Sequence, residues 1–212
     1  MVRTRPYHRW LMLVPLLTSG IWFYTIEQKI RMPEYTLYVR FDDYIPYVPL
    51  FVIPYVFWYV YVAAAAVFLF FKSRCAFIKN AVFLTAGMII ACTIYTIFPN
   101  GQSLRPDLSG QDEPLIRLIR FIYTYDSPVN CAPSIHVIHS VAAHAAICRY
   151  NKLRVAWVNR TSFIIAGLCV MSTVFIKQHS VIDLLAGLAV SCILYLLIYN
   201  FIPMAVLMKR EK

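Results

Sequence analysis

Charged residues are scarce in this 212-residue chain, because Asp, Glu, Lys and Arg make up only 14 % of it while 60 % is hydrophobic. A soluble domain of this size has too little interior to hide so many apolar side chains. The composition therefore excludes a free soluble protein and indicates a protein of the lipid bilayer. The sequence leaves no room for a separate soluble domain.

Several sequence motifs are also missing. The six cysteines form no CxxC pair and no Cys/His metal spacing, and no HExxH motif occurs. Only Cys131 is expected on the outer side of the membrane, so no disulfide framework is predicted. No small-x-small cleavage site follows the first apolar stretch, which is therefore expected to remain as a helix.

Six long apolar stretches predict six transmembrane helices in a single domain, residues 1–212. A spanning helix needs about 20 apolar residues, so six of them use nearly the whole chain. The predicted spans are about 10–26, 47–71, 80–98, 133–149, 159–176 and 181–205. The fold class expected is an all-α integral membrane bundle.

Basic residues are unevenly distributed among the predicted loops. If both termini are cytoplasmic, thirteen of the twenty basic residues but one of the ten acidic residues face the cytoplasm. The positive-inside rule then predicts a multi-pass protein, expected in the plasma membrane, with cytoplasmic N- and C-termini. Its basicity reflects orientation and contact with anionic membrane lipids, so no nucleic-acid partner is expected. No particular oligomeric state is predicted.

The longest predicted outer loop, between spans three and four, contains an amphipathic segment. Asp112 can cap a helix there and Pro114 suits its first turn. The apolar positions at helical spacing are Leu115, Leu118, Ile119 and Ile122. Arg117 and Arg120 lie opposite, which predicts a helix on the membrane surface. Structural cover is the preferred role, and contact of the arginines with lipid headgroups is the alternative.

Three polar clusters, far apart in the sequence, fall at the predicted outer face. They are QSLRP at 102–106 after span three, PSIH at 133–136 before span four, and HSVID at 179–183 before span six. Ionisable groups close to the membrane interior are energetically costly, so they are usually retained there for a function. Their shared depth therefore predicts one active site facing the extracytoplasmic side.

Three residues of these clusters are predicted to be catalytic. His179 and Asp183 have i,i+4 spacing, so they are expected to share a helix face. A carboxylate on one imidazole nitrogen leaves the other nitrogen free as a nucleophile or base. His136 is expected in the first turn of span four, beside a helix N-terminus that suits phosphate, where it can protonate a leaving oxygen.

Phosphate-binding roles are predicted for four further residues, Arg105, Ser134, Lys177 and Gln102. Arg105 can hold a phosphate with two parallel hydrogen bonds. Lys177 is alternatively an interfacial lysine whose amine reaches water. A zinc site of His136, His139 and Asp183 is the less favoured alternative, so the prediction contains no metal and no cofactor.

Together the clusters resemble the phosphatidic acid phosphatase type 2 superfamily, whose pattern is KxxxxxxRP, then PSGH, then SRxxxxxHxxxD. The matching positions are Arg105, Pro133, Ser134, His136, Ser172, His179 and Asp183. The resemblance implies a six-helix bundle and no metal requirement. It also implies that His179 forms a phosphohistidine, that Asp183 orients it, and that His136 is the general acid.

This sequence departs from the superfamily pattern at three positions. Phe98 replaces the first lysine, Ile135 replaces the glycine of PSGH, and Thr173 replaces an arginine. Two phosphate-binding cations are therefore missing, and we expect Lys177 to compensate. The PSxH form and the aromatic, proline-rich second span look more like the branch of inositol phosphorylceramide and sphingomyelin synthases.

The predicted function is that of a metal-independent enzyme that hydrolyses a lipid phosphomonoester or diphosphate, with a lipid phosphate as its substrate. Transfer of a phospholipid headgroup to an alcohol is the first alternative. A non-catalytic, lipid-binding protein is the second. A transporter is disfavoured because it would be expected to place its polar groups near the membrane midplane.

Overall fold

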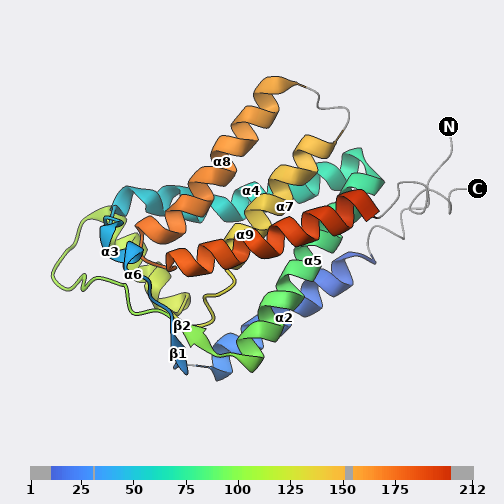
Figure 1. Ribbon diagram of the computed structural model, residues 1–212. Coiled ribbons are helices and arrows are strands. Elements are labelled where there is room, and N and C mark those ends of the chain that lie inside the picture. Colours follow the sequence, from blue (N-terminus) through green and yellow to red (C-terminus); the bar gives the residue numbers. More distant parts are fainter. Residues whose placement is uncertain (1–10, 31, 151–154, 202–212) are drawn as a thin grey trace, which may run out of the picture.

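Long helices form most of the protein in this computed structural model, which describes residues 11–30, 32–150 and 155–201 (Figure 1). They are α2 (Leu13–Lys29), α4 (Val52–Lys72), α5 (Arg74–Ile97), α7 (Ile135–Arg149), α8 (Ala156–Phe175) and α9 (Val181–Leu196), which continues as a π-helical turn, η3 (Leu197–Phe201). The shorter elements are β1 (Tyr35–Thr36), α3 (Phe41–Tyr44), η1 (Pro49–Phe51), β2 (Asn100–Gly101) and α6 (Pro114–Tyr125).

Four helices are long and apolar enough to cross a membrane, at Pro49–Lys72, Arg74–Ile97, Ala156–Phe175 and Val181–Phe201. The other two predicted spans correspond to helices of 17 and 15 residues, α2 and α7. The described chain is thus an all-α protein of membrane-spanning type. Residue 10, residues 202–205 and both predicted cytoplasmic termini lie outside the described residues.

The third span begins earlier than predicted, because α5 starts at Arg74 rather than at residue 80. The Ser73 hydroxyl accepts a hydrogen bond from the Ala76 amide at 3.3 Å and caps the helix. Arg74 and Lys79 therefore lie inside the helix. A stretch free of charge marks the apolar part of a span, but the helix itself continues through cationic residues near the interface.

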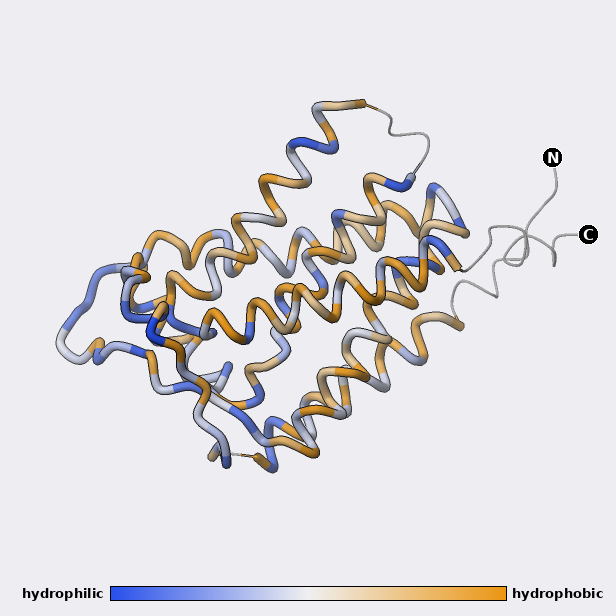
Figure 2. Tube along the Cα trace, in the orientation of Figure 1, coloured by the Kyte–Doolittle hydropathy of each residue, from blue (hydrophilic) through white to orange (hydrophobic). Residues whose placement is uncertain are grey.

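Apolar and polar side chains are arranged as expected for a bilayer. Large apolar side chains such as Phe57, Trp157 and Phe163 are exposed along α4 and α8, whereas Asn80 and Ser140 are buried between helices. Figure 2 shows hydrophobic residues along the helices and hydrophilic segments gathered in the loops beside α3 and α6. An apolar exterior of this extent is suited to contact with lipid chains.

Helix α7 lies at the centre of the bundle and contacts α4, α5, α8 and α9. It approaches α9 closely at Gly187, where an added Cβ atom would lie 2.9 Å from the Ser134 carbonyl oxygen and 2.9 Å from Val137 Cβ. Any larger residue would push the two helices apart. This contact brings together the beginnings of α7 and α9, where the second and third polar clusters lie.

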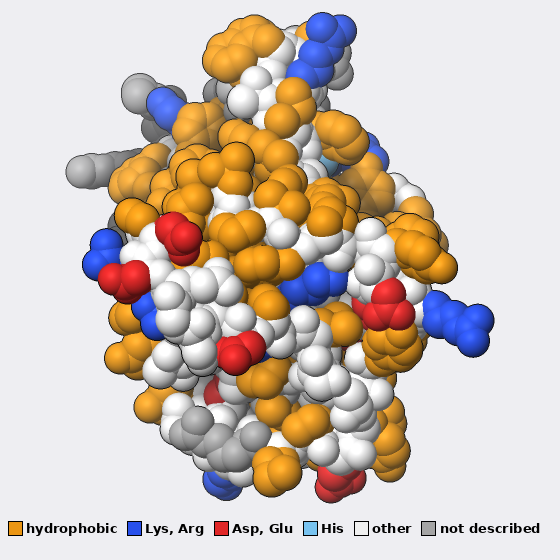
Figure 3. Space-filling model, turned by 90° about the vertical axis from the view of Figure 1, so that its left-hand side faces the viewer, with side chains coloured by type: hydrophobic (Ala, Val, Ile, Leu, Met, Phe, Trp, Pro, Cys, Tyr) orange, Lys and Arg blue, Asp and Glu red, His pale blue; other side chains and the backbone are white. Residues whose placement is uncertain are grey.

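The loops cover one end of the bundle. β1 and β2 form a parallel pair in which Tyr35 is opposite Asn100, and Gly101 bridges to Val129. The helix predicted in this loop is confirmed as α6, although Leu118 is exposed and Ile116 takes its place on the buried face. This face packs against the start of α4. Figure 3 views this end and shows acidic and basic side chains among apolar ones.

Candidate active site

The second and third polar clusters lie together at the covered end. The rings of His136 and His179 have centroids 5.9 Å apart, and His179 Nδ1 lies 3.3 Å from Asp183 Oδ2. The Ser134 amide donates a 3.1 Å hydrogen bond to the Asp183 carbonyl, which connects the starts of α7 and α9. The predicted grouping of two histidines with one carboxylate is therefore present.

The pairing of His179 with Asp183 arises from a helix cap. His179 precedes Ser180, the N-cap of α9, so the expected shared helix face is wrong: His179 lies outside the helix. Ser180 and Asp183 form a capping box, in which Asp183 Oδ2 accepts a 2.9 Å hydrogen bond from the Ser180 amide. The same oxygen faces His179, while Asp183 Oδ1 is buried with no partner among the described residues.

His136 is held between aromatic rings. Its imidazole stacks on Tyr55 at a centroid distance of 4.5 Å and lies 4.2 Å from the Trp58 ring. Trp58 Nε1 also donates a 3.1 Å hydrogen bond to the His136 carbonyl. His136 Nε2 is buried and has no hydrogen-bond partner in the described chain, so it is available to a bound molecule.

A cavity of about 530 Å³ opens beside both histidines. Aromatic side chains from α2, α4 and α5 line it, together with two carboxylates, Glu27 and Asp126. No lysine or arginine is among the described residues that line it. The cavity can thus admit a small polar group beside the imidazoles, but its lining carries negative rather than positive charge.

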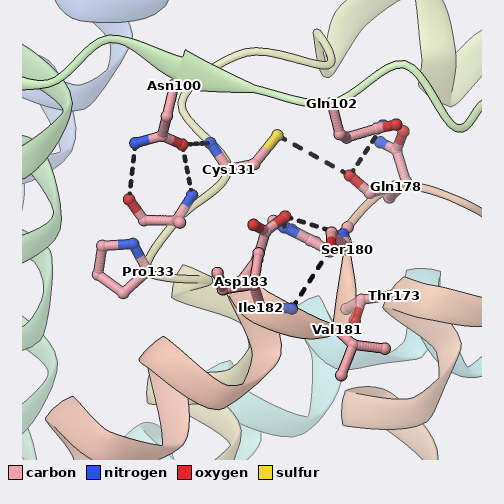
Figure 4. Close-up of polar contacts among 12 residues, drawn as sticks. Asn100, Gln102, Cys131, Pro133, Thr173, Gln178, Ser180, Val181, Ile182 and Asp183 are labelled. Carbon is pink, nitrogen blue, oxygen red and sulfur yellow. Dashed lines mark hydrogen bonds and ion pairs between the residues drawn. The ribbon is translucent and has the colours of Figure 1, made fainter. Parts of the chain in front are cut away.

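Asn100 organises the loop before α7. Its Oδ1 accepts hydrogen bonds from the amides of Cys131 at 3.0 Å and Ala132 at 2.7 Å (Figure 4). Cys131 lies at the predicted end of the molecule but is 2 % exposed, and its thiol donates to the Gln178 carbonyl at 4.0 Å. Burial raises the pKa of the Cys131 thiol well above its ordinary value, so the thiol is protonated at neutral pH.

Arg105 binds backbone carbonyls at the end of α6. Its guanidinium donates to the carbonyls of Tyr123, at 3.0 Å, and Asp126, and it lies 4.2 Å from the centre of the Tyr123 ring. Burial lowers the pKa of Arg105, while Asp126 opposes that shift, and a guanidinium remains charged in any case. In this arrangement Arg105 holds the end of α6 against the bundle.

Lys177 is likewise bound to the backbone. Its amine donates to the carbonyls of Asp42 at 2.8 Å and Ile45 at 2.6 Å. Its own backbone has φ +55°, a left-handed conformation that is uncommon for lysine. Lys177 therefore connects the turn between α8 and α9 to the loop around α3.

Gln102 and Ser134, the other predicted phosphate ligands, differ from one another. Gln102 donates from Nε2 to the carbonyls of Lys177, at 3.0 Å, and Gln178, at 3.2 Å, and is buried as part of the scaffold. Ser134 is the N-cap of α7, yet its hydroxyl makes no capping hydrogen bond and has no partner among the described residues. Of these two, Ser134 retains a free polar group next to His136.

Two residues that depart from the superfamily pattern, Phe98 and Thr173, make contacts within the protein. Phe98 stacks on Tyr35 with ring centroids 4.0 Å apart. Thr173 is buried, and its carbonyl accepts from the amides of Gln178 and His179. His139 Nε2 lies 3.2 Å from the Leu84 carbonyl oxygen. This contact engages His139 Nε2 with the backbone of α5.

Sequence reasoning missed two carboxylates that support the site. Asp42 is 2 % exposed, and its oxygens accept from the Ser180 hydroxyl at 2.6 Å and the Val181 amide at 2.8 Å. Glu27 accepts from Ser127 Oγ and Asn130 Nδ2, both at 2.8 Å. Glu27 lies in the last turn of α2 and Asp42 in the short helix α3. From the sequence alone both belong to a charged outer segment, where acidic residues are usually solvated, so only the position of this segment at the membrane edge could have indicated a role.

Chemically, the site offers an oriented imidazole, a second imidazole with a free nitrogen, and a hydroxyl at a helix N-terminus. Such a set can perform nucleophilic attack and proton transfer on a phosphate ester. Compared with models of known protein families and with curated protein sequences, the chain matches none at a significant level.

Proposed function

We propose that the protein is a membrane-embedded enzyme that hydrolyses a phosphate ester of a lipid through a phosphohistidine. The observation that carries this proposal is the pairing of His179 with Asp183. The ring of His136 lies 5.9 Å from that of His179, and a cavity of about 530 Å³ opens beside both histidines. The six-span topology, the extracytoplasmic site and a plasma-membrane location belong to the same proposal.

In the first step, the free imidazole nitrogen of His179 attacks phosphorus and forms an N–P bond. The bond from phosphorus to the lipid oxygen breaks, and His136 gives its proton to the departing alkoxide. Asp183 holds the tautomer of His179 and balances the positive charge on its ring. Water then attacks phosphorus, the N–P bond breaks, and inorganic phosphate leaves as His136 takes back a proton.

The start of α7 is the best-supported seat for the phosphate. Helix N-termini attract anions through unpaired amides and the helix dipole. At α9 this position is already filled by the carboxylate of Asp42. At α7 the Ser134 hydroxyl and His136 Nε2 have no partners in the described chain. Arg105 and Lys177 then position loops around the phosphate rather than touch it.

Headgroup transfer from a phosphodiester is the second candidate, and the charge of the cavity favours it. Glu27 and Asp126 line the cavity, and the lysines and arginines of the described chain do not. A monoester dianion gains little from such a lining, whereas a diester carries one negative charge. An acceptor hydroxyl would then replace water in the second step.

A substrate panel with purified protein tests the proposal. Phosphatidate, phosphatidylglycerophosphate, an isoprenyl diphosphate and labelled phosphodiester lipids are each supplied with and without alcohol acceptors, in EDTA. Release of inorganic phosphate from a monoester or diphosphate, absent in His179→Ala and retained in His144→Ala, is the expected result. A new phosphodiester formed only with acceptor supports the second candidate. No product from any donor would overturn both.

A further inference from the structure

Three side chains capable of binding metal meet beside the two histidines. Cys131 Sγ, a ring nitrogen of His179 and a carboxylate oxygen of Asp183 all lie within 4.8 Å of one another. Cys131 and Asp183 are buried, and the side chain of His179 is 11 % exposed. They come from the loop before α7, the turn after α8 and the first turn of α9, so the folded bundle alone assembles them.

The ligand atoms suit a small thiophilic dication. Zinc bonds to sulfur at about 2.3 Å and to imidazole nitrogen at about 2.0 Å, so tetrahedral ligands lie roughly 3.3–3.7 Å apart. His179 Nδ1 and Asp183 Oδ2 are already 3.3 Å apart. Magnesium and calcium prefer sets of oxygen ligands, whereas this group has one carboxylate, one sulfur and one nitrogen.

One carboxylate oxygen of Asp183 is free to bind a ligand. Asp183 is fully buried, and its Oδ1 atom has no hydrogen-bond partner among the described residues. Burying a carboxylate oxygen without a partner is unfavourable, and a bound cation would compensate it. Cys131 and His179 also line the cavity, which gives an ion a path to the group and leaves a fourth position for water.

We propose that Cys131, His179 and Asp183 form a binding site for a thiophilic divalent cation such as Zn²⁺ or Cd²⁺. The thiol releases one proton to water on binding, and the thiolate and carboxylate then balance the charge of the ion. This site differs from the His136, His139 and Asp183 set considered from the sequence, because His139 contacts the Leu84 carbonyl instead.

Metal binding at this site would be inhibitory if the proposed function holds. The ion takes His179 Nδ1, which is the atom that faces Asp183 in the pair that orients the nucleophile. With the ion on Nδ1, His179 no longer pairs with the Asp183 carboxylate. The ion also withdraws electron density from the imidazole ring, which makes its other nitrogen a weaker nucleophile. Inhibition rests on the proposed function, whereas binding of the ion does not.

Cadmium titration of the full-length protein in detergent tests the site directly. Wild-type protein is expected to bind one Cd²⁺ with thiolate-to-cadmium charge-transfer absorption and a rise in Tm. Cys131→Ser should lose that absorption and bind at least tenfold more weakly. Cys148→Ser, which removes an exposed thiol at the other end of α7, should behave as wild type.

Four outcomes decide the proposal. Absorption that persists in Cys131→Ser, or no binding by wild type at submillimolar Cd²⁺, would overturn it. If Cys131→Ser does not fold, His179→Gln retains the thiol and must still weaken binding tenfold. Cadmium binding by a wild-type protein that turns over no lipid in the substrate panel would support the metal site and refute the proposed function.

Discussion

The carboxylate of Asp42 accepts a 2.6 Å hydrogen bond from the hydroxyl of Ser180, a residue 138 positions further along the chain. Ser180 is the N-cap of the helix that carries Asp183, and it directly follows His179. The short helix α3, in the first quarter of the sequence, therefore contacts the start of α9. The geometry of the proposed catalytic pair, His179 and Asp183, is therefore expected to depend on this contact.

Asp42→Ala should destabilise the protein and lower its activity. The substitution leaves the Ser180 hydroxyl and the Val181 amide without their acceptor, and such losses amount to about 1–3 kcal/mol. Thermal unfolding in detergent and lipid phosphatase activity measure the two effects. Asp43→Ala is the matched control, because Asp43 is exposed and its carboxylate accepts a hydrogen bond from the Tyr38 hydroxyl. Equal Tm values for the two variants would show that Asp42 does not hold α9.

His179→Ala should abolish turnover, and Asp183→Asn should reduce it by about 10² or more, because an amide favours the wrong imidazole tautomer. Rates with the substrate identified in the panel measure both changes. His144→Ala is a suitable control, since His144 contacts Ser162 at 3.0 Å and lies further along α7. Substantial activity in His179→Ala would exclude the phosphohistidine.

His136→Ala should slow a lipid substrate far more than an activated aryl phosphate. The lipid alkoxide needs a proton as it leaves, whereas an acidic phenol does not, so general acid catalysis of about 10²–10⁴-fold disappears only for the lipid. The ratio of kcat/KM for the two substrates is the measurement. Equal losses would assign His136 to binding or structure instead of proton transfer.

Gly187→Ala should separate the starts of α7 and α9. The new Cβ would lie 2.9 Å from the Ser134 carbonyl oxygen, so the helices must move. A displacement near 1 Å between catalytic groups lowers rates by about 10²-fold. Gly167→Ala has no atom within 4 Å of its Cβ and should retain activity, which makes it the control for a helical glycine. Similar activities in both variants would contradict the close approach.

Orientation in the membrane can be measured with single cysteines. Cys131 is buried and is therefore a poor reporter, so we choose Ser109→Cys in the exposed loop before α6. An impermeant thiol reagent added to intact cells should label Ser109→Cys, whereas the exposed Cys148 at the opposite end of α7 should react only after permeabilisation. The reverse pattern would place the site in the cytoplasm.

Both the helices and the grouping of the histidines could be predicted from the pattern of apolar and polar residues along the sequence. Apolar runs determine where a chain can cross a bilayer, and polar residues at the ends of runs on one side must lie at similar depth. This reasoning predicts that His136, His179 and Asp183 lie at one end of the bundle. The structure confirms their proximity and leaves their chemistry as a proposal.

The supporting contacts could not be predicted, because they depend on which backbone atoms approach in three dimensions. Arg105 and Lys177 were expected at the phosphate, yet each binds two backbone carbonyls. Asp42 lies in the four-residue helix α3, which is too short to leave a periodic pattern in the sequence. Capping contacts between distant segments leave no local spacing in the sequence, so propensity and motif reasoning do not detect them.

The central helix α7 has 15 residues, and at 1.5 Å per residue it extends about 22 Å, less than the roughly 30 Å hydrocarbon core of a bilayer. A helix of this length cannot reach both interfaces. If its final residue, Arg149, lies at the cytoplasmic interface, its first turn and His136 lie several ångströms below the opposite interface. A lipid can then present its phosphate by sinking slightly within its own leaflet, with its acyl chains still among neighbouring lipids. For the proposed lipid substrate, the short helix favours entry from the side of the bilayer rather than extraction into water.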